Sequence, residues 1–268
     1  YEIIVIPSYF FGRTIKCVYL IPINFRDFFR KNPSNIKKDN SLVLDLNFGE
    51  GSVKVGVLGS YVVDSSKYKN DGILERGAKV IETDFGKSLE FKGGYVKVDN
   101  SNSLDISNEI TIIAWVKTYE DKKFIQTIVS KGSTNPMNDD WSYYFTLRNN
   151  GVQMTLYDNE SSLHEVVGNS GQICTDRFYH IAGVYNGKTM KIYIDGQEVK
   201  DFYREINKTW ESNIQSNDRP LWIGANERFY QGQGFEGMIS SVLIYNRALT
   251  EEEIKMNYYE GLQKYNST

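Results

Sequence analysis

Apolar and polar residues alternate along most of the chain, with the period of two that β-strands show when one face is buried. In residues 41–48, SLVLDLNF, the alternation places Leu42, Leu44, Leu46 and Phe48 on one face. The same period recurs in EITIIAWVK (109–117), SYYFTLR (142–148), VQMTLYD (152–158), FYHIAGVY (178–185), TMKIYID (189–195) and GMISSVLIY (237–245). The pattern predicts short antiparallel strands whose apolar faces pack together in two layers.

Turn signals separate several of these segments. The dipeptides Asn-Gly at 186–187 and Asp-Gly at 195–196 tolerate positive φ, and each can close a tight hairpin between alternating runs. Asn-Asn-Gly at 149–151 is a third signal of this kind. These turns predict a three-stranded meander around residues 178–199 and a second antiparallel pair before it.

The fold class predicted from these patterns is all-β, as an antiparallel β-sandwich or jelly roll with one short C-terminal helix. No period of 20–50 residues repeats, and long helical periodicity is absent. The helix is predicted in ALTEEEIKMNYYEGL (248–262), where Thr250 as N-cap and Glu253 form a capping box. Gly261 is the expected stop signal of this helix.

The N-terminal residues 1–40 differ from residues 41–268. An apolar, β-rich arm at 1–25 is followed by the basic, polar segment FRDFFRKNPSNIKKDN, which has the composition of a connector, so the predicted boundary lies near 38–41. One interpretation is that the arm folds back on its own domain, since an exposed apolar strand invites aggregation. The other is that the arm adds to the sheet of a neighbouring molecule.

The charge pattern excludes one class of partner. The formal net charge is −3, and residues of both signs are interspersed, so nucleic acid is not an expected partner. The longest apolar run near the N-terminus, CVYLIPINF, is about half of the roughly 20 residues that a membrane helix requires, and no membrane span is predicted.

The chain contains two cysteines, Cys17 and Cys174. In an exported protein they can form one disulfide that closes a long loop. The alternative is a pair of inert buried thiols, and the sequence leaves both interpretations open.

The order of several motifs resembles the laminin G-like, concanavalin A-like lectin superfamily, in its bacterial and archaeal extracellular form. The resemblance covers residues 42–260 and rests on LVLDLNF, VVDSSKYKNDGIL, GKSLEFKGGYVKVDNSNSLDISNEITIIAWVK, FYHIAGVYNGKTMKIYIDGQEV, LWIGAN and FEGMISSVLIYNRALTEEEI. It implies a concanavalin A-like jelly roll in which the KIYIDG turn is a structural hairpin. Trp115 and His180 are similar to positions that the family uses for packing, and we expect both in the core.

The sequence predicts no enzyme activity. A hydrolase on this fold needs two or three carboxylates on alternate residues of one strand, about 5 Å apart, and no strand has the E-x-D-x-E pattern. Glu82 and Asp84 lack a third acid and are interpreted as surface charge. Cys174 and His180 have no orienting motif, and phosphate loops and zinc-ligand spacings are absent.

Calcium is the one cofactor that the resemblance implies. Asp64, Asn70 and Asp71 in VVDSSKYKNDG offer the oxygen ligands that this ion prefers. The family's late motif usually carries acidic residues where this chain has Ser240 and Ser241, which removes expected ligands. The alternative interpretation is that Asp64 and Asn70 cap turns.

Loop aromatics, amides and carboxylates are the candidates for ligand contacts, because a sugar offers a ring face for stacking and hydroxyls for hydrogen bonds. The candidates are Asp139, Asp140, Trp141, Trp210, Asn226, Glu227 and Tyr230. A loop tryptophan also commonly shields a core edge or occupies a protein interface.

Three sequons for N-linked glycosylation begin at Asn159, Asn207 and Asn266. They matter only if the protein is exported in an organism that glycosylates such sites.

Two functions compete, and a third, a glycan hydrolase, lacks the carboxylates that it would need. The first is a non-enzymatic extracellular or cell-surface module for recognition or adhesion, which binds glycans or surface proteins through loops at the rim of the sandwich. The second is a structural subunit of a filament, coat or virion, which self-assembles by strand addition through residues 1–25.

Overall fold

A computed structural model describes residues 2–10, 13–21, 40–49, 51–57, 59–119, 124–135, 138–175, 177–226 and 232–265. Side chains are described from residue 40 onward within these ranges, except at 133–139 and 264–265. The chain divides into two compact units, Tyr1–Lys37 and Lys38–Thr268. The division lies beside the boundary predicted near 38–41.

The first unit contains an antiparallel strand pair. Strand β1 (Glu2–Phe10) pairs with β2 (Arg13–Ile21) in continuous register from Glu2 opposite Ile21 to Phe10 opposite Arg13. Both strands are rich in β-branched and aromatic residues, which favour extended backbone. Whether the arm packs on its own domain or on a neighbour stays a prediction.

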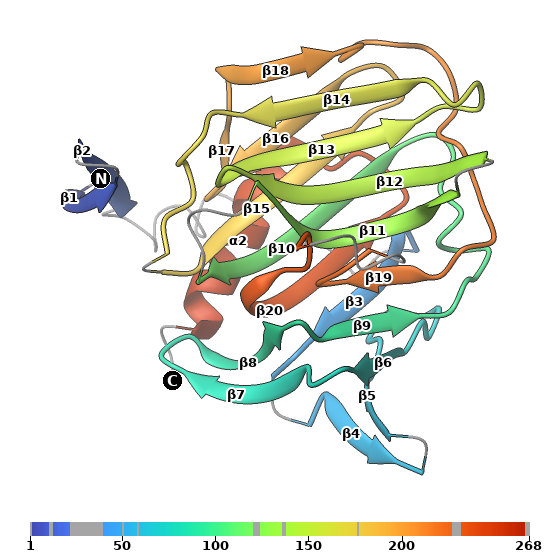
Figure 1. Cartoon of the computed structure of the whole chain (residues 1–268), viewed down its shortest axis with the longest axis horizontal. Coiled ribbons are helices and arrows are strands. Elements are labelled where there is room, and N and C mark those ends of the chain that lie inside the picture. The colour runs from blue at the N-terminus through green and yellow to red at the C-terminus, as the bar shows by residue number, and fades with distance from the viewer. Residues whose placement is uncertain are drawn as a thin grey trace. The chain divides into compact units, whose positions relative to one another are not determined.

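The second unit is a sandwich of two antiparallel sheets (Figure 1). The eight-stranded sheet has the order β17 (Gln197–Glu198), β16 (Met190–Ile194), β15 (Tyr179–Tyr185), β10 (Ile110–Thr118), β20 (Glu236–Tyr245), β8 (Gly86–Lys92) and β7 (Lys79–Thr83), and β3 (Leu42–Asn47) also pairs with β20. The ten-stranded sheet has the order β18 (Phe202–Ile206), β14 (Leu163–Gly168), β13 (Gly151–Tyr157), β12 (Asn138–Arg148), β11 (Ile125–Asn135), β19 (Leu221–Ile223), β9 (Tyr95–Val98), β6 (Gly72–Glu75), β5 (Gly59–Val62) and β4 (Val53–Gly56).

The main core lies between these two sheets. Leu44 and Ile112 from the eight-stranded sheet and Phe145 and Met154 from the ten-stranded sheet are completely buried in one apolar cluster. Their alternation along each strand is the pattern expected when hydrophobic burial drives two layers together. The predicted all-β sandwich is confirmed.

The prediction that Leu42 shares a face with Leu44 is wrong. Leu44 lies opposite Ile244 and Leu42 lies opposite Tyr245, so Val43 is an extra residue in the ladder between β3 and β20. A bulge of this kind rotates the strand, because two residues then oppose one. Leu42 consequently packs in a second apolar cluster on the other side of the eight-stranded sheet.

Helix α2 (Glu251–Tyr265) covers that outer face of the eight-stranded sheet (Figure 1). Its predicted capping box is confirmed, since the Thr250 amide donates to Glu253 Oε2 at 2.9 Å and the Glu253 amide donates to Thr250 Oγ1 at 3.2 Å. The predicted stop at Gly261 is wrong, because the helix continues to Tyr265. Tertiary packing explains the glycine: a Cβ at this position would lie 2.5 Å from Trp115 Nε1.

Trp115 and His180 are buried beneath this helix, as predicted. Trp115 is 3% exposed and His180 is fully buried, and their rings meet edge to face with centroids 5.3 Å apart. The His180 Nε2 atom contacts Asn257 Oδ1 of α2 at 3.0 Å. Burial lowers the pKa of His180 to about 4, so its imidazole is neutral near neutral pH.

Two of the three predicted tight turns are present as expected: Asn149 and Asn150 have φ of 48° and 59°, and Asp195 and Gly196 have φ of 50° and 72°. The third hairpin is longer than predicted, since residues 186–189 separate Tyr185 from its partner Met190, and Gly187 has φ of 80°. These positive values are the backbone conformation of hairpin turns whose twist matches the adjoining strands. Among the described helices, none is long and apolar enough to cross a membrane.

Candidate functional site

The candidate site lies on the outer face of the ten-stranded sheet, which points away from the core. On β12, Tyr143 and Phe145 pack in the core, so Tyr144 between them points outward. On β13, Met154 packs in the core and Thr155 points outward by the same alternation. This face is therefore built from the polar half of each strand.

Strand pairing aligns outward side chains from five neighbouring strands. Residues opposite one another in successive ladders are Trp222 on β19, Ser130 on β11, Tyr144 on β12, Thr155 on β13 and Glu165 on β14. We call these five residues the cross-strand row. Neighbouring strands lie about 4.8 Å apart. Tyr144 is half-buried, whereas Ser130, Thr155, Glu165 and Trp222 are only 0–7% exposed, so Tyr144 is the most accessible member of the row.

Tyr144 stands at the centre of the row. Its ring lies 5.3 Å from that of Trp141, and its hydroxyl is 2.9 Å from Thr127 Oγ1. The hydroxyl also donates to Gln233 Oε1 at 3.3 Å, and Asn226 Nδ2 donates to the same oxygen at 3.0 Å. Burial raises the pKa of Tyr144, which keeps the phenol protonated and able to donate. Trp141 and Asn226, both predicted from the sequence, are thus brought together around Tyr144.

Glu165 ends the row in a second polar cluster. Its Oε2 accepts from Gln153 Nε2 at 2.5 Å and from Thr155 Oγ1 at 3.3 Å, while Arg204 Nε lies 3.1 Å from its Oε1. The Glu165 side chain is 5% exposed, so these contacts offset the cost of removing a carboxylate from water.

Several polar atoms on this face have no partner. The Ser142 and Thr146 hydroxyls and Gln153 Oε1 are buried without a hydrogen bond. A buried polar atom without a partner costs about 1–3 kcal/mol, because it has lost its bonds to water. Because these atoms have essentially no exposed surface, a ligand can bond them only after the side chains above them move.

Asp140 lies at the end of this face and is already engaged. Its Oδ2 is 3.0 Å from Arg219 Nε, and its backbone oxygen accepts from Asn217 Nδ2 at 3.0 Å. The carboxylate therefore positions the 217–219 segment. Because its charge is matched by Arg219, it is a supporting group at the edge of the site.

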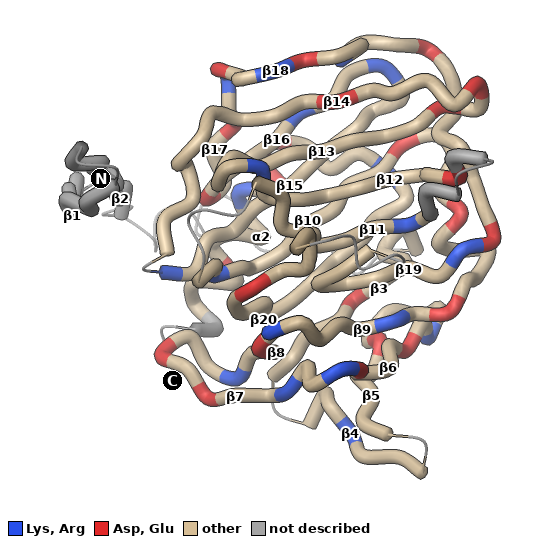
Figure 2. Tube along the Cα trace, in the orientation of Figure 1, with Lys and Arg blue, Asp and Glu red and all other residues tan. Residues whose placement is uncertain are grey.

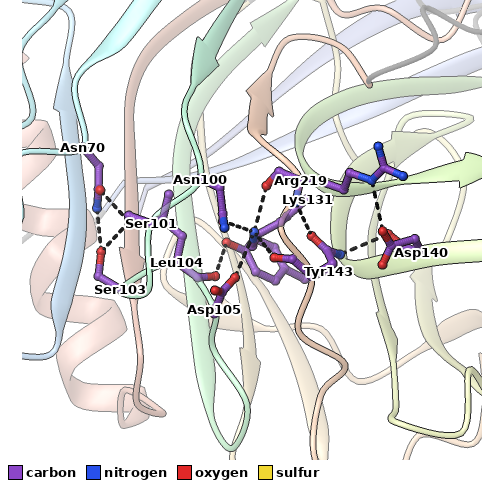
Figure 3. A network of polar contacts seen from close by, with 11 residues as sticks. Asn70, Asn100, Ser101, Ser103, Leu104, Asp105, Lys131, Asp140, Tyr143 and Arg219 are labelled. Carbon is purple, nitrogen blue, oxygen red and sulfur yellow. Dashed lines mark hydrogen bonds and ion pairs between the residues drawn. The ribbon is translucent and has the colours of Figure 1, made fainter.

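A buried lysine stabilises the loops beside Asp140 (Figure 3). Lys131 is fully buried, and its ammonium group lies 2.6 Å from Asn100 Oδ1, 3.0 Å from Asp105 Oδ1, and 3.0 and 2.9 Å from the carbonyl oxygens of Asn217 and Arg219. Burial lowers the pKa of Lys131, and the hydrogen bond and charge of Asp105 oppose that shift. The cation joins two loops to β11.

Trp210 lies apart from the cross-strand row. It is 9% exposed, belongs to the main core cluster, and stacks on His164 and Tyr185 with ring centroids 3.8 and 3.9 Å away. The sequence predicts Trp210 as a loop residue that contacts a ligand, whereas the structure places it in the core. Neighbouring loop residues gave no sign of this stacking, which depends on strands distant in sequence.

The remaining ligand predictions lie outside the described part of the structure. This applies to Glu227, to Tyr230 and to the side chain of Asp139. Sequence reasoning missed Tyr144, Gln153 and Glu165, although their alternation with buried residues indicates that they face outward. Their alignment with one another depends on strand register, which the alternation does not specify.

The loop proposed for calcium has a different role in the structure. Both oxygens of the buried Asp64 carboxylate accept hydrogen bonds, Oδ1 from the Asp45 and Ser66 amides and Oδ2 from the Ser66 hydroxyl and the Asn70 amide, at 2.6–2.8 Å. Asp71 Oδ1 accepts from the Asp64 amide at 2.8 Å. Donated hydrogens occupy the oxygens that a cation needs, so the geometry of Asp64 does not fit calcium.

Within the described residues, no group of three or more His, Cys, Asp or Glu side chains could hold a metal ion. Calcium binding therefore stays a prediction without support from this geometry.

The modification sites also stay predictions. Asn159 and Asn207 are exposed, and Asn207 Nδ2 donates to the Leu163 carbonyl at 3.1 Å, while Asn266 lies outside the described residues. Cys174 is half-buried beside Tyr179, whose hydroxyl accepts from its amide at 3.3 Å. The side chain of Cys17 is outside the described part of the structure.

Comparison with solved structures shows the same fold in several binding domains. The binding domain of Paraclostridial Mosquitocidal Protein 1 matches with a TM-score of 0.60 and 18% identity, over 83% of this chain and 52% of that one. The botulinum neurotoxin serotype D ligand-binding domain, solved with N-acetylneuraminic acid, matches with a TM-score of 0.57 and 19% identity, over 82% and 51% of the two chains. This chain thus spans about half the length of these toxin domains.

A carbohydrate complex is also among the similar structures. Domain 4 of an extracellular arabinanase from Geobacillus stearothermophilus, in complex with arabinotriose, matches with a TM-score of 0.56 and 18% identity, over 80% of this chain and 97% of that one. A search of curated protein sequences found no significant match.

A sequence profile of the laminin G-like type called Laminin_G_3 matches residues 91–255, which is more than half of the chain. The matched region includes the main strands of both sheets and the start of α2. The sequence resemblance is therefore confirmed, and the chain belongs to the concanavalin A-like lectin/glucanases superfamily.

Proposed function

We propose that this chain is a non-enzymatic, extracellular carbohydrate-binding module whose ligand lies on the cross-strand row. The observation that carries the proposal is the alignment of Trp222, Ser130, Tyr144, Thr155 and Glu165 on one face. Aromatic rings can stack on the apolar faces of sugars, while hydroxyl and carboxylate groups can bond sugar hydroxyls.

The two outer faces of the sandwich differ in a way that supports this placement. Helix α2 covers the outer face of the eight-stranded sheet with apolar contacts that include Ile254 and Ile113. The outer face of the ten-stranded sheet instead carries polar side chains, among them Gln153 and Tyr144. Tyr144 is half-buried, so its ring can meet a ligand directly.

The contacts of Glu165 are those of a supporting carboxylate. Gln153, Thr155 and Arg204 engage its oxygens, and its side chain is 5% exposed. Glycoside hydrolysis needs carboxyl groups that flank the scissile bond. A carboxylate that is buried and engaged in this way is better suited to setting the charge of the face.

The similar structures support the same ligand class. One was solved with arabinotriose and another with N-acetylneuraminic acid, so this fold accommodates carbohydrate in other proteins. Their identity to this chain is 18–19%, which supports the fold and leaves the ligand to be established by experiment.

A glycan array followed by titration calorimetry tests the proposal. Tyr144→Ala should weaken binding at least about tenfold, because it removes the central ring and its hydroxyl. Tyr144→Phe keeps the ring and removes the hydroxyl. It should weaken binding less than Tyr144→Ala and should disturb the fold less. Tyr203→Ala is the matched control, since Tyr203 is 62% exposed on the edge strand β18 of the same sheet.

Absence of binding to any glycan would overturn the proposal. Equal affinities for Tyr144→Ala and the unchanged chain, with normal circular dichroism, would also overturn the assignment to this face. If the same row binds a surface protein and no glycan, the proposed glycan ligand is wrong and the binding face stands.

Strands β1 and β2 are the observation that favours the second function, a subunit of a filament or coat. Their nine-residue antiparallel ladder presents apolar, β-branched segments, which can add to the sheet of another molecule. Deleting residues 1–38 and measuring mass by light scattering tests this function. If the full chain and the deletion variant each have the mass of a single chain, assembly through the arm is excluded.

A further inference from the structure

The charges around the cross-strand row bear on the class of glycan. Strand β13, the third strand from the β18 edge of the ten-stranded sheet, contains no charged residue, and the only charged residue of β11 is Lys131 (Figure 2). Lys131 is fully buried and bound to Asp105, so it does not face a ligand. Charged groups that can meet a ligand therefore stand at the ends of the face.

Cations at these ends are matched by carboxylates. Arg204 Nε lies 3.1 Å from Glu165 Oε1, and Arg219 Nε lies 3.0 Å from Asp140 Oδ2. Lys97, which extends the row beyond Trp222, is 3.5 Å from Asp99. Each of these cations has a partner that an anionic ligand would have to displace.

Two described cations on this face, Arg148 and Lys54, have no ion pair with another described residue, and Lys54 lies on β4 at the far edge of the sheet. Arg148 lies at the end of β12, and its guanidinium stacks 4.5 Å above the ring of Phe124. It is four residues from Tyr144 along the strand, about 13 Å away at 3.3 Å per residue. The sugar residue that stacks on Tyr144 would therefore be too far away to contact Arg148.

Glu165 itself disfavours an anion. It is a carboxylate in the row, and its side chain is only 5% exposed, so solvent screens its charge weakly. A ligand carboxylate or sulfate above Thr155 would meet a like charge before it met Arg204. Juxtaposed like charges suppress binding of the wrong partner.

We propose that the ligand of the cross-strand row is a neutral oligosaccharide, and that Glu165 excludes acidic glycans by holding Arg204 and by its own charge. This inference rests on the proposed function and specifies its substrate class. A neutral sugar can stack on the half-buried Tyr144 ring without disturbing the ion pair between Glu165 and Arg204.

The test compares matched neutral and acidic probes on the full chain. Galactotriose is paired with trigalacturonic acid, and lactose with 3′-sialyllactose, within a wider array of neutral and acidic glycans. We expect binding to neutral members, with the acidic partner of any bound glycan at least about tenfold weaker.

The decisive variant is Glu165→Gln, which keeps the shape of the side chain and leaves Arg204 without its carboxylate. It should raise affinity for the acidic probe at least about tenfold relative to the unchanged chain. Adding Arg204→Gln should remove that gain. Glu198→Gln is the matched control, because Glu198 pairs with Lys191 on the other sheet and its loss changes net charge equally.

The outcomes separate the two proposals. Tight binding of acidic glycans that is lost in Tyr144→Ala would overturn the neutral class while the binding face stands. Failure of Glu165→Gln to gain acidic binding, with its fold intact by circular dichroism, would overturn the role of Glu165. Absence of all glycan binding would overturn both the function and this inference.

Discussion

Gly261→Ala tests how tightly α2 packs on the sandwich. A methyl group added at Gly261 would lie 2.5 Å from Trp115 Nε1 and 2.7 Å from both Cε2 and Cζ2. Distances this short are well inside van der Waals contact, so either the helix or the indole must move. Trp115 cannot easily yield, since Phe85, His180 and Tyr258 surround it at ring centroid distances of 4.8, 5.3 and 5.7 Å.

Two effects of opposite sign decide the free energy of unfolding. Replacing glycine by alanine inside a helix favours the helix by about 1 kcal/mol. Overpacking a well-filled core commonly costs about 1–3 kcal/mol, and contact with three atoms of a rigid ring places this case near the upper value. The net expectation is a loss of about 2 kcal/mol, which corresponds to a fall of about 4–8 °C in Tm.

Thermal and urea unfolding followed by circular dichroism measure this loss. A double-mutant cycle with Trp115→Leu provides the control, because the smaller side chain removes the clash. In that background Gly261→Ala should become neutral or stabilising by up to about 1 kcal/mol. A higher Tm for Gly261→Ala alone would refute the reasoning, since it would show that helix propensity outweighs packing at this site.

Three further predictions concern stability. Burial lowers the pKa of His180 to about 4 in the folded chain, so the unfolded chain takes up the proton first as the pH falls from about 6.5 to about 4. The free energy of unfolding should therefore fall by about 3 kcal/mol over this range, which urea unfolding at each pH can measure. This loss should be smaller in His180→Asn. Lys131→Met should cost about 2–3 kcal/mol in chemical unfolding, because Asp105 loses its buried cation, whereas Lys188→Met, at an exposed ion pair, should cost under about 1 kcal/mol. Thr250→Ala should lower the unfolding free energy by about 1 kcal/mol through loss of the N-cap, and an unchanged Tm would contradict a stabilising role for the capping box.

The fold was predictable because its signals are local. Alternation in SYYFTLR places Tyr143 and Phe145 inside, and Asn149 and Asn150 close the hairpin with positive φ. The Thr250 capping box likewise depends on residues three positions apart. Each signal can be identified without knowing where the rest of the chain lies.

The errors share a different origin. The interpretation of Gly261 as a stop overlooked Trp115, which is 146 positions away in the printed sequence and directly beneath the helix. Leu42 changed faces because of a bulge against Tyr245, and Trp210 was buried by stacking on His164 and Tyr185. In each case a contact between distant segments overrode a local pattern.

The sequence by itself determined that the seven alternating segments form strands, how α2 begins, and to which superfamily the chain belongs. Only the tertiary structure decided which outward side chains meet, as when Trp222, Ser130 and Tyr144 align across three strands. The physical reason is that strand propensity and turn chemistry act over a few residues, whereas register is determined by hydrogen bonding and burial between distant segments. A ligand face made from several strands is consequently a property of the register.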